Sequence, residues 1–230
     1  MKISIVIPAL NEEAGIASVI NQIPTAQLQK DGYEVEIVVV DNGSKDRTAE
    51  IAFSHGANVI PEPKRGYGNA YKTGFKNVSG DIIVTGDADM TYPFDRTKEL
   101  VDFLLDNDLD FLNTNRLGKL NLGMTARIHM FGTSCLSWLM RTLFKCPFRD
   151  SQSGMWIFKR SILQTISVES SGMPFSQEIK IEAFTKGFKC DEIPIEYRSR
   201  IGKSKLNILK DGLQTIVQLF KKCLSSRKNS

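Results

Sequence analysis

The chain has 230 residues, of which 41% are apolar and 24% charged, so it is long enough to bury its own core, and low-complexity disorder and collagen-like repeats are excluded. Its net charge of +4 is unevenly distributed: residues 111–149 hold six basic and no acidic residues, and residues 197–230 hold nine basic residues and one acidic residue. Two such basic segments favour a polyanionic partner such as phosphate, nucleic acid or an anionic membrane surface. Its longest apolar runs fall well short of the roughly 18 residues of a membrane-spanning helix, and its first residues lack the pattern of a secretory signal peptide.

Apolar runs alternate with amphipathic segments over the first half of the chain. The runs predict strands at residues 2–8, 35–40, 58–60, 81–85 and 109–113, and the amphipathic segments predict helices at 12–23, 45–55, 68–78 and 93–106. Strands that alternate with helices in this way are typical of a mostly parallel sheet covered on both faces. Ligands bind such sheets at the carboxyl ends of the strands, so we expect the chemistry in the segments that follow them.

The second half has longer helices and fewer strands. Its pattern predicts a loop at 114–123, a helix at 124–144, a strand at 155–159, a helix at 176–186, a strand at 190–197 and a loop at 198–205. From Leu206 to Leu224 apolar residues recur at the spacing of one helical face, which predicts an amphipathic C-terminal helix. The four cysteines are far apart and form no Cys-x-x-Cys pair, which indicates reduced thiols in a cytoplasmic protein.

Acidic residues directly follow two of the buried strands. Asp41 follows the strand at 35–40, and Asp87-Ala88-Asp89 lies just after the strand at 81–85. Two carboxylates one residue apart repel each other unless a cation or hydrogen-bond donors lie between them. Asp87 and Asp89 therefore suit one hard divalent cation, with substrate phosphates completing its oxygen shell. The alternative for each acidic residue is a structural role in a turn or a helix cap.

A basic, glycine-containing turn precedes the helix predicted at 68–78. It reads Lys64-Arg65-Gly66-Tyr67-Gly68, and a turn of this kind can hold a phosphate through backbone N–H groups and the helix dipole. It lacks the third glycine of a dinucleotide-binding fingerprint, and the chain has no Gly-x-x-x-x-Gly-Lys-Ser/Thr sequence, which disfavours a P-loop nucleotidase. A plain turn that uses glycine for its backbone freedom is the alternative.

Taken in order, these segments resemble glycosyltransferase family 2, and in particular the dolichyl- and polyprenyl-phosphate hexose synthases. The resemblance rests on residues 8–12, 38–48, 64–70, 86–89, 150–154, 177–178 and 200–206. It implies a GT-A fold, which is a Rossmann-like α/β fold with a mostly parallel sheet, helices on both faces and C-terminal amphipathic helices. It also implies a glycosyltransferase domain at 1–205, with a nucleotide-sugar half (1–113) and an acceptor half (114–205), followed by a basic amphipathic helix and tail at 206–230.

The resemblance implies an inverting transfer of a hexose from a nucleotide sugar to dolichyl or polyprenyl phosphate, with Mg²⁺ or Mn²⁺ held by Asp87 and Asp89. The residues it places at the nucleotide sugar are Pro8, Ala9, Asn11, Glu12, Asp41, Lys64, Arg65, Asp87, Ala88 and Lys205. The candidate catalytic residues are Asp89, Glu178 and Arg200. The candidates for binding the acceptor phosphate are Arg116, Arg127 and Ser134, and arginine suits this task because its planar group can donate to two phosphate oxygens at once.

Three positions depart from the family pattern. Asn42 replaces the second aspartate of the usual Asp-Asp-Gly-Ser, and Thr91 stands where the mannosyl branch often has a glutamine that binds the metal. Arg200 lies two residues before Gly202, whereas the mannosyl branch has its arginine three residues before the glycine. The last two departures favour UDP-glucose or UDP-N-acetylglucosamine as the donor, with GDP-mannose as the alternative.

The chemistry of the acceptor determines whether the enzyme needs a base. A phosphomonoester is largely a dianion at neutral pH, so positioning and charge neutralisation suffice. A soluble hydroxyl acceptor would need a general base, which Glu178 or Asp150 would supply. A third hypothesis is a protein that binds nucleotide sugar or nucleic acid without catalysis. We expect no nucleic-acid partner, because no aromatic stacking residues accompany the basic segments.

The helices predicted at 124–144 and 206–224 lie in the two basic segments. Helices with an apolar stripe, aromatic residues and flanking lysines or arginines can lie in the headgroup region of a bilayer, and packing against the sheet is the alternative. We therefore expect a peripheral enzyme on the cytoplasmic face of a membrane, attached by these helices or by a membrane-anchoring subunit.

Overall fold

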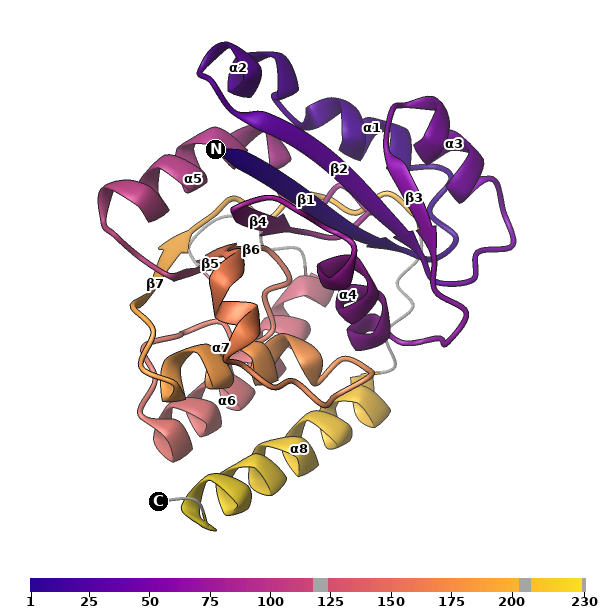
Figure 1. Cartoon of the computed structure of the whole chain (residues 1–230). Coiled ribbons are helices and arrows are strands. Elements are labelled where there is room, and N and C mark those ends of the chain that lie inside the picture. The colour runs from indigo at the N-terminus through magenta and orange to yellow at the C-terminus, as the bar shows by residue number, and fades with distance from the viewer. Residues whose placement is uncertain (118–123, 203–207, 229–230) are drawn as a thin grey trace.

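The buried runs of the sequence form the strands of one twisted sheet (Figure 1). The computed structural model describes residues 1–117, 124–202 and 208–228. The strands are β1 (Lys2–Ala9), β2 (Glu34–Asp41), β3 (Asn58–Pro61), β4 (Ile82–Thr85), β5 (Phe111–Asn115), β6 (Trp156–Lys159) and β7 (Cys190–Pro194). They lie in the order β3-β2-β1-β4-β6-β5-β7.

Most neighbouring strands in this sheet are parallel. β1 pairs in parallel with β2 and β4, β2 with β3, and β5 with β7, whereas β6 runs antiparallel between β4 and β5. The predicted α/β fold with a mostly parallel sheet is therefore confirmed. Because β6 inserts between two strands from the first half of the chain, residues 1–113 and 114–202 share one sheet.

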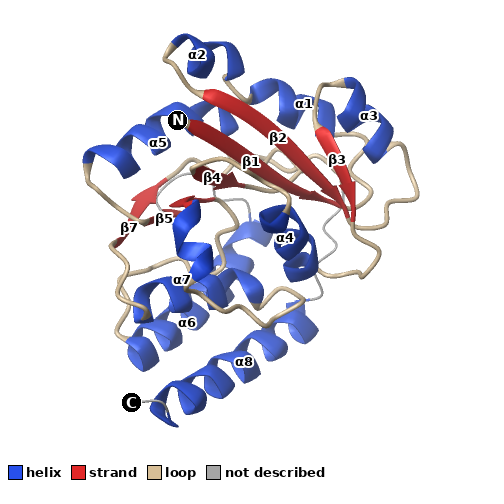
Figure 2. Cartoon of the chain, in the orientation of Figure 1, coloured by secondary structure: helices blue, strands red, loops and turns tan. Residues whose placement is uncertain are grey.

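Helices cover both faces of the sheet (Figure 2). One face carries α1 (Ile16–Gln22), α2 (Thr25–Lys30), α3 (Thr48–Ser54) and α5 (Thr97–Asp106), and the other carries α4 (Tyr67–Lys76), α6 (Met124–Phe144), α7 (Phe175–Thr185) and α8 (Ile208–Lys228). In β1, Ile3, Ile5 and Ile7 pack on the first set of helices and Val6 on the second. The central strands are therefore apolar on both sides, as expected for strands that helices cover twice.

The observed elements differ from the predicted ones over short stretches. The helices predicted at 12–23 and 45–55 begin only at Ile16 and Thr48, and the one predicted at 93–106 begins with a 3₁₀ turn, Phe94–Arg96. The sequence does not predict α2 or the 3₁₀ turn at Arg160–Gln164, because six and five residues are too few for a helical period to appear. The strand predicted at 190–197 ends at Pro194, and β5 extends to Asn115, so residues 114 and 115 belong to a strand and not to the predicted loop. The helix predicted at 124–144 has those bounds. The four cysteines, all within the described residues, form no disulfide with one another.

Candidate active site

The segments after β1 and β2 lie together at one edge of the sheet (Figure 1). Ala9 pairs with Asp41 at the ends of the two strands. The backbone N–H of Asn11 donates to Ser44 Oγ (2.9 Å), and Asn11 Oδ1 accepts from the N–H of Lys45 (2.7 Å). Asp41 Oδ1 accepts from the N–H of Ser44 (3.1 Å). The structure therefore brings together Ala9, Asn11 and Asp41, which the resemblance places at the nucleotide.

Asn42 links the end of β2 to the turn before α4. It is buried, and its amide group donates to the carbonyl oxygens of Glu62 and Lys64, both at 2.9 Å. Its Oδ1 accepts from the N–H of Gly66 (2.7 Å). An aspartate would place a carboxylate oxygen, in the position of the amide nitrogen, against both carbonyl oxygens, so the amide explains why this chain departs from the family pattern here.

Asn42→Asp is expected to lower the free energy of unfolding by about 2 kcal/mol, because the carbonyl groups of Glu62 and Lys64 lose their donor and face a carboxylate oxygen instead. Chemical denaturation monitored by circular dichroism measures this loss. Asn107→Asp is the matched control, since the amide of Asn107 also donates to a carbonyl oxygen, that of Phe103 (2.8 Å), but at an exposed position. Equal losses in the two variants would contradict the role given to Asn42.

The N-terminus of α4 is covered by another part of the chain. The N–H of Asn69 donates to the carbonyl oxygen of Ser171 (3.1 Å), and the N–H of Gly66 is already bonded to Asn42. A Cβ atom on Gly68 would lie 2.4 Å from the carbonyl oxygen of Ser170, so this turn packs closely on residues 170 and 171. The N–H groups of Gly66 and Asn69 are therefore occupied by acceptors of the protein itself, and a phosphate held by the backbone of this turn stays a prediction for its other N–H groups.

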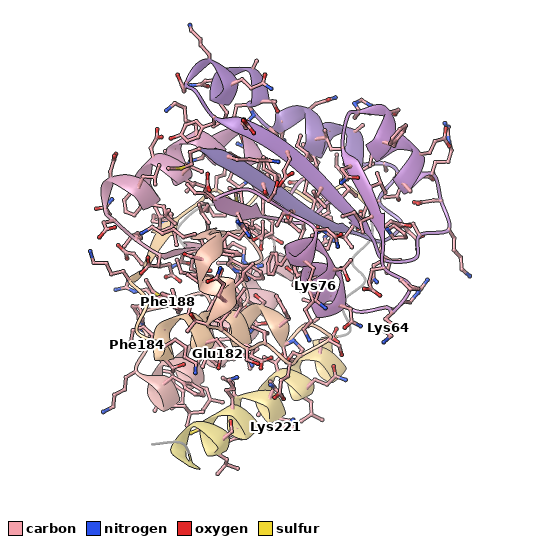
Figure 3. The ribbon with its side chains drawn as sticks, in the orientation of Figure 1. Lys64, Lys76, Glu182, Phe184, Phe188 and Lys221 are labelled. Atoms are coloured by element: carbon pink, nitrogen blue, oxygen red, sulfur yellow. The ribbon has the colours of Figure 1, made fainter. Side chains whose placement is uncertain are left out.

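The basic side chains of the same turn remain accessible. Lys64 and Arg65 are both exposed, and Lys64 lies at the outer edge of the turn beside α4 (Figure 3). Arg65 Nη2 donates to the carbonyl oxygen of Gly43 (3.2 Å), which holds its guanidinium over the segment that follows β2. These two side chains are therefore placed where they could contact a phosphate.

Asp87 and Asp89 follow β4 and lie in contrasting surroundings. Asp89 is 2% exposed, and its Oδ1 accepts from the N–H (3.1 Å) and the hydroxyl (2.5 Å) of Thr91. Asp87 is half-buried, and its Oδ1 accepts from the hydroxyl of Tyr67 (3.2 Å). Burial and, secondly, the charge of Asp89 raise the pKa of Asp87 to about 7. The pair therefore lies where an additional cation would be favourable.

Arg200 supplies one positive charge to this pair. Its Nη1 lies 2.6 Å from Asp89 Oδ2, and the N–H of Ile201 donates to the carbonyl oxygen of Asp89 (2.9 Å). The structure thus brings together Asp87, Asp89 and Arg200, as the resemblance implies for a diphosphate site. Because the hydroxyl of Thr91 donates to Asp89, Thr91 orients that carboxylate.

The oxygen ligands at this point suit a hard divalent cation such as Mg²⁺ or Mn²⁺. Within residues 1–117, 124–202 and 208–228, no group of three or more histidine, cysteine or carboxylate side chains could hold a metal. Asp87 and Asp89 would therefore supply only part of the ligand shell of the cation. Phosphate oxygens of the substrate would supply other ligands, as is common for Mg²⁺ sites.

Arg116, which is half-buried, and Asp150, which is fully buried, form an ion pair. Arg116 Nε lies 2.8 Å from Asp150 Oδ2 and Nη2 lies 3.0 Å from Oδ1, while Nη1 takes part in neither contact. The guanidinium carbon also lies 5.2 Å from the ring centre of Tyr197. Burial acts to raise the pKa of Asp150, but Arg116 holds it below its usual value. Asp150 is therefore an ionised partner of Arg116. Both of its carboxylate oxygens accept hydrogen bonds within the protein, whereas a general base needs an oxygen that can take a proton from the substrate.

One loop, residues 150–154, connects this ion pair with the acidic pair. Asp150 lies at its start, and at its end the N–H of Gly154 donates to the hydroxyl oxygen of Tyr92 (2.6 Å). A Cβ atom on Gly154 would lie 2.4 Å from Tyr67 Oη and 3.3 Å from Asp87 Oδ1, so the backbone here approaches the acidic pair as only glycine allows. The two charged groups are thus held at the two ends of the same short loop.

Glu178 points away from this arrangement, toward a neighbouring loop and α8. Its carboxylate accepts from the N–H groups of Ser170 (2.9 Å) and Glu169 (3.2 Å), and Lys222 Nζ lies 3.4 Å from Oε1. Lys222 also lies 2.7 Å from Glu182 Oε1, and Figure 3 shows Glu182 on α7 beside α8. Burial would raise the pKa of Glu178, but these donors keep it below its usual value. This geometry suits an anchor of the 169–170 segment and argues against the base or sugar contact expected from the sequence.

The remaining candidates for the acceptor phosphate are described only in part. Ser134 is exposed on α6, and its hydroxyl donates to the carbonyl oxygen of Met130 in the same helix (2.8 Å). The side chain of Arg127 and the whole of Lys205 lie outside the described residues.

Three side chains that contribute to the site are missed by the sequence reasoning. Tyr67 and Tyr92 approach Asp87 and Gly154, and Lys180 of α7 lies beneath the loop at 150–154. Tyr67 belongs to the basic turn and Tyr92 follows the acidic pair closely, so both could have been noticed from position. Nothing in the sequence marks Lys180, because a lysine in a helix is usually at the surface.

Comparisons with known proteins find similar chains among glycosyltransferases. The family model described as Glycosyl transferase family 2 matches residues 4–167. The low-salt glycan biosynthesis hexosyltransferase Agl6 of Haloferax volcanii is 37% identical over 91% of this chain, which spans about half (51%) of that relative's length. The dolichyl-phosphate hexose transferase of the same organism is 32% identical over 98% of this chain and 95% of its own length.

Solved structures share the fold. The crystal structure of glucosyl-3-phosphoglycerate synthase from Mycobacterium tuberculosis in complex with Mn²⁺, UDP and glucosyl-3-phosphoglycerate superposes with a TM-score of 0.78 at 25% sequence identity. The alignment covers 96% of this chain and 80% of that one. The GT-A architecture expected from the sequence is therefore present.

Proposed function

Since the chain belongs to glycosyltransferase family 2 and is a glycosyltransferase, we propose that it transfers a hexose, with inversion, from a UDP-sugar to the phosphate of dolichol or another polyprenol. One observation carries this proposal: the Asp87, Asp89 and Arg200 cluster and the Arg116–Asp150 pair lie at the two ends of one loop. Such a site can hold a diphosphate and a second phosphate beside each other. The relative named dolichyl-phosphate hexose transferase, which this chain matches over nearly its whole length, supports this choice of acceptor.

On the donor side, residues 1–113 bind the nucleotide sugar. Asp87 and Asp89 would hold Mg²⁺ or Mn²⁺, and the bound ion would neutralise charge on the leaving diphosphate. Arg200, already paired with Asp89, adds a second positive charge to the same group. The structural relative solved with UDP and Mn²⁺ supports a uridine nucleotide, with UDP-glucose or UDP-N-acetylglucosamine as the donor and GDP-mannose as the alternative.

On the acceptor side, Arg116 docks the lipid phosphate. A phosphate oxygen attacks the anomeric carbon opposite the diphosphate, the new C–O bond forms, and the electron pair of the broken bond leaves with the nucleotide. No proton has to be removed, because the acceptor is already an anion. The structure agrees with this chemistry, since the carboxylates of Asp150 and Glu178 are both occupied by donors.

A panel of labelled donors tests this function. UDP-glucose, UDP-N-acetylglucosamine and GDP-mannose are each incubated with dolichyl phosphate and Mn²⁺ or Mg²⁺, with and without EDTA. We expect label from one donor to enter the organic phase and EDTA to prevent it. Absence of lipid-linked label with all three donors would overturn the proposed acceptor.

A soluble acceptor is the second candidate, because the structural relative was solved with glucosyl-3-phosphoglycerate. The same panel therefore includes phosphoglyceric acid. Label that stays in the aqueous phase as a phosphorylated glycoside would favour this candidate. It would also require a base, which neither Asp150 nor Glu178 is placed to provide.

The chain also presents an apolar surface formed by α6 and α8. We define the α6–α8 face by its exposed apolar side chains, which are Phe131, Trp138, Leu213, Ile216, Val217, Phe220 and Leu224. A cavity of about 430 Å³ with almost wholly apolar walls lies between Trp138 and Ile216. The exposed cations Arg141 and Lys221 lie about one helical turn from Trp138 and Val217. No helix among the described residues is apolar over a stretch long enough to cross a bilayer.

We propose that the α6–α8 face rests on an anionic membrane surface on the cytoplasmic side. Its apolar side chains would enter the acyl boundary while the nearby cations meet lipid phosphates. Such a position would bring the acceptor's phosphate to the protein without removing its chain from the bilayer. A membrane-anchoring subunit covering the same face is the alternative partner.

Sedimentation with vesicles of phosphatidylglycerol and phosphatidylcholine tests this attachment. Trp138→Ser combined with Phe220→Ser is expected to weaken binding by about 100-fold or more, because each aromatic side chain that enters the bilayer contributes roughly 1.5–3 kcal/mol. Phe53→Ser is the matched control, since Phe53 is also an exposed aromatic residue (73%) but lies on α3, on the other face of the sheet. Wild-type protein that stays in the supernatant would contradict attachment to lipid and favour a protein anchor.

A further inference from the structure

Lys180 is a fully buried lysine whose ammonium group is directed at the loop of residues 150–154. Its Nζ donates to the carbonyl oxygens of Ser151 and Ser153, both at 2.8 Å, and lies 3.3 Å from Ser176 Oγ. An ammonium group has three donors, so all three are used. Among the side chains that the structure describes, no carboxylate forms an ion pair with Lys180.

A cation in this position is costly for the fold. Moving an ammonium group out of water without a paired anion is unfavourable even when it is hydrogen-bonded. Burial lowers the pKa of Lys180 to about 7, although the more distant charge of Asp150 opposes this. The ring of Trp156, whose centre lies 5.5 Å away, offsets part of the cost. A methionine of similar length would fill the same space at lower cost, so packing does not explain the lysine.

The two ends of the loop depend on Lys180 to different extents. At the far end, Gly154 is held independently, because its N–H donates to Tyr92 Oη (2.6 Å) and its carbonyl oxygen accepts from Thr85 Oγ1 (2.9 Å). At the near end, Asn113 and Glu192 hold the backbone of Asp150, and Lys180 is the charged donor that joins the carbonyl groups of Ser151 and Ser153. Loss of the ammonium group would therefore loosen residues 151–153, which directly follow Asp150, while Gly154 stays in place beside the acidic pair.

We propose that Lys180 is a positioning residue for the acceptor: by holding the carbonyl groups of Ser151 and Ser153, it fixes the residues that follow Asp150. Together with Asn113 and Glu192, which hold the backbone of Asp150, it aims Arg116 at the lipid phosphate through Asp150. Lys180 itself touches neither substrate. This role rests on the proposed function, since it assumes that Arg116 binds the acceptor. Loss of Lys180 should therefore raise the KM for the acceptor and not the KM for the donor, an effect that loss of a purely structural core residue would not have.

Lys180→Met is the test, with kinetics measured separately for donor and acceptor. We expect the KM for dolichyl phosphate to rise about tenfold, the KM for the UDP-sugar to stay within about twofold, and the affinity for UDP with Mn²⁺ by calorimetry to be unchanged. Lys180→Gln, which keeps an amide donor, should show a smaller rise in the acceptor KM. An acceptor KM within about twofold of wild type in both variants would overturn the proposal.

Ile162→Ala is the control for general destabilisation, because Ile162 is fully buried in the core on the same face of the sheet but makes no contact with the loop among the hydrogen bonds described. Ile162→Ala should lower the free energy of unfolding without raising the acceptor KM relative to the donor KM. If it raised the acceptor KM alone, as Lys180→Met is expected to do, the role of Lys180 would be overturned.

Hydrogen exchange distinguishes failure of this inference from failure of the proposed function. In Lys180→Met the backbone N–H groups of residues 151–153 should exchange faster than in wild type, whereas that of Gly154 should not change. If wild-type enzyme transfers nothing to lipid phosphate, the proposed function fails, and this measurement still decides whether Lys180 holds the loop. Unchanged exchange across residues 151–153 would overturn the positioning role.

Discussion

Asp89→Ala is expected to lower kcat/KM for hexose transfer by about 10³-fold or more and to abolish its dependence on Mn²⁺. Asp89 is buried, accepts two hydrogen bonds from Thr91 and pairs with Arg200 at 2.6 Å. Removing it deletes a ligand of the ion and releases the arginine that faces the same diphosphate. Both losses raise the energy of the leaving group in the transition state. Transfer assays over a range of Mn²⁺ concentrations, with calorimetric titration of UDP, measure the effect.

Asp95→Ala is the matched control for this change. Asp95 also binds an arginine of the same segment, with Arg198 Nη1 and Nη2 at 2.7 and 2.9 Å, but it lies outside the acidic pair. We expect its activity to stay within a few-fold of wild type, because a partly exposed ion pair contributes little. Circular dichroism establishes that both variants are folded. If Asp89→Ala transfers hexose as wild type does, with the same response to Mn²⁺, the metal assignment is wrong.

Arg116→Lys is expected to raise the KM for lipid phosphate by about 10- to 100-fold and to leave the KM for the UDP-sugar nearly unchanged. Lysine keeps the charge that Asp150 needs, but it lacks the planar group that can hold Asp150 on one edge and a phosphate on another. Arg116→Ala is less informative, since it would leave the fully buried Asp150 unpaired and destabilise the protein by about 3–5 kcal/mol. Steady-state kinetics with each substrate varied in turn measure the two KM values.

Arg198→Lys provides the comparison for this substitution. Arg198 binds Asp95 through two guanidinium nitrogens, as Arg116 binds Asp150, but outside the proposed acceptor site. Its substitution should therefore leave both KM values close to wild type. Equal increases in the donor and acceptor KM of Arg116→Lys would count against a contact between Arg116 and the acceptor phosphate.

Much of the fold can be read from local patterns. Alternating apolar runs and amphipathic segments predict how strands and long helices follow one another along the chain, because each pattern is set by residues that are neighbours in the sequence. The same patterns do not predict that β6 inserts antiparallel between β4 and β5. Strand order is decided by which apolar surfaces pack together, and β6 satisfies both neighbours through Ile157 and Phe158.

The functional site likewise has features that the sequence predicts and features that only the tertiary structure shows. Asp87 and Asp89 can be recognised from sequence because two carboxylates at the end of a buried strand need a cation, whatever surrounds them. Glu178 looks like a candidate base in sequence, yet its partners are Ser170 and the distant Lys222, which makes it an anchor. Arg116 is correctly marked as a basic residue after a strand, but its pairing with Asp150, 34 residues away, is visible only in three dimensions.

By itself the sequence determined the succession of elements, the acidic pair after β4 and the apolar stripe of α8, since each depends on spacing along the chain. Only the tertiary structure decided which partners the polar side chains have. Asn42 is bonded to the turn before α4, Glu178 to α8, and Lys180 to the loop at 150–154. The physical reason is that a buried polar group must be paired with whatever group folding brings within hydrogen-bond distance, and that group is usually remote in sequence.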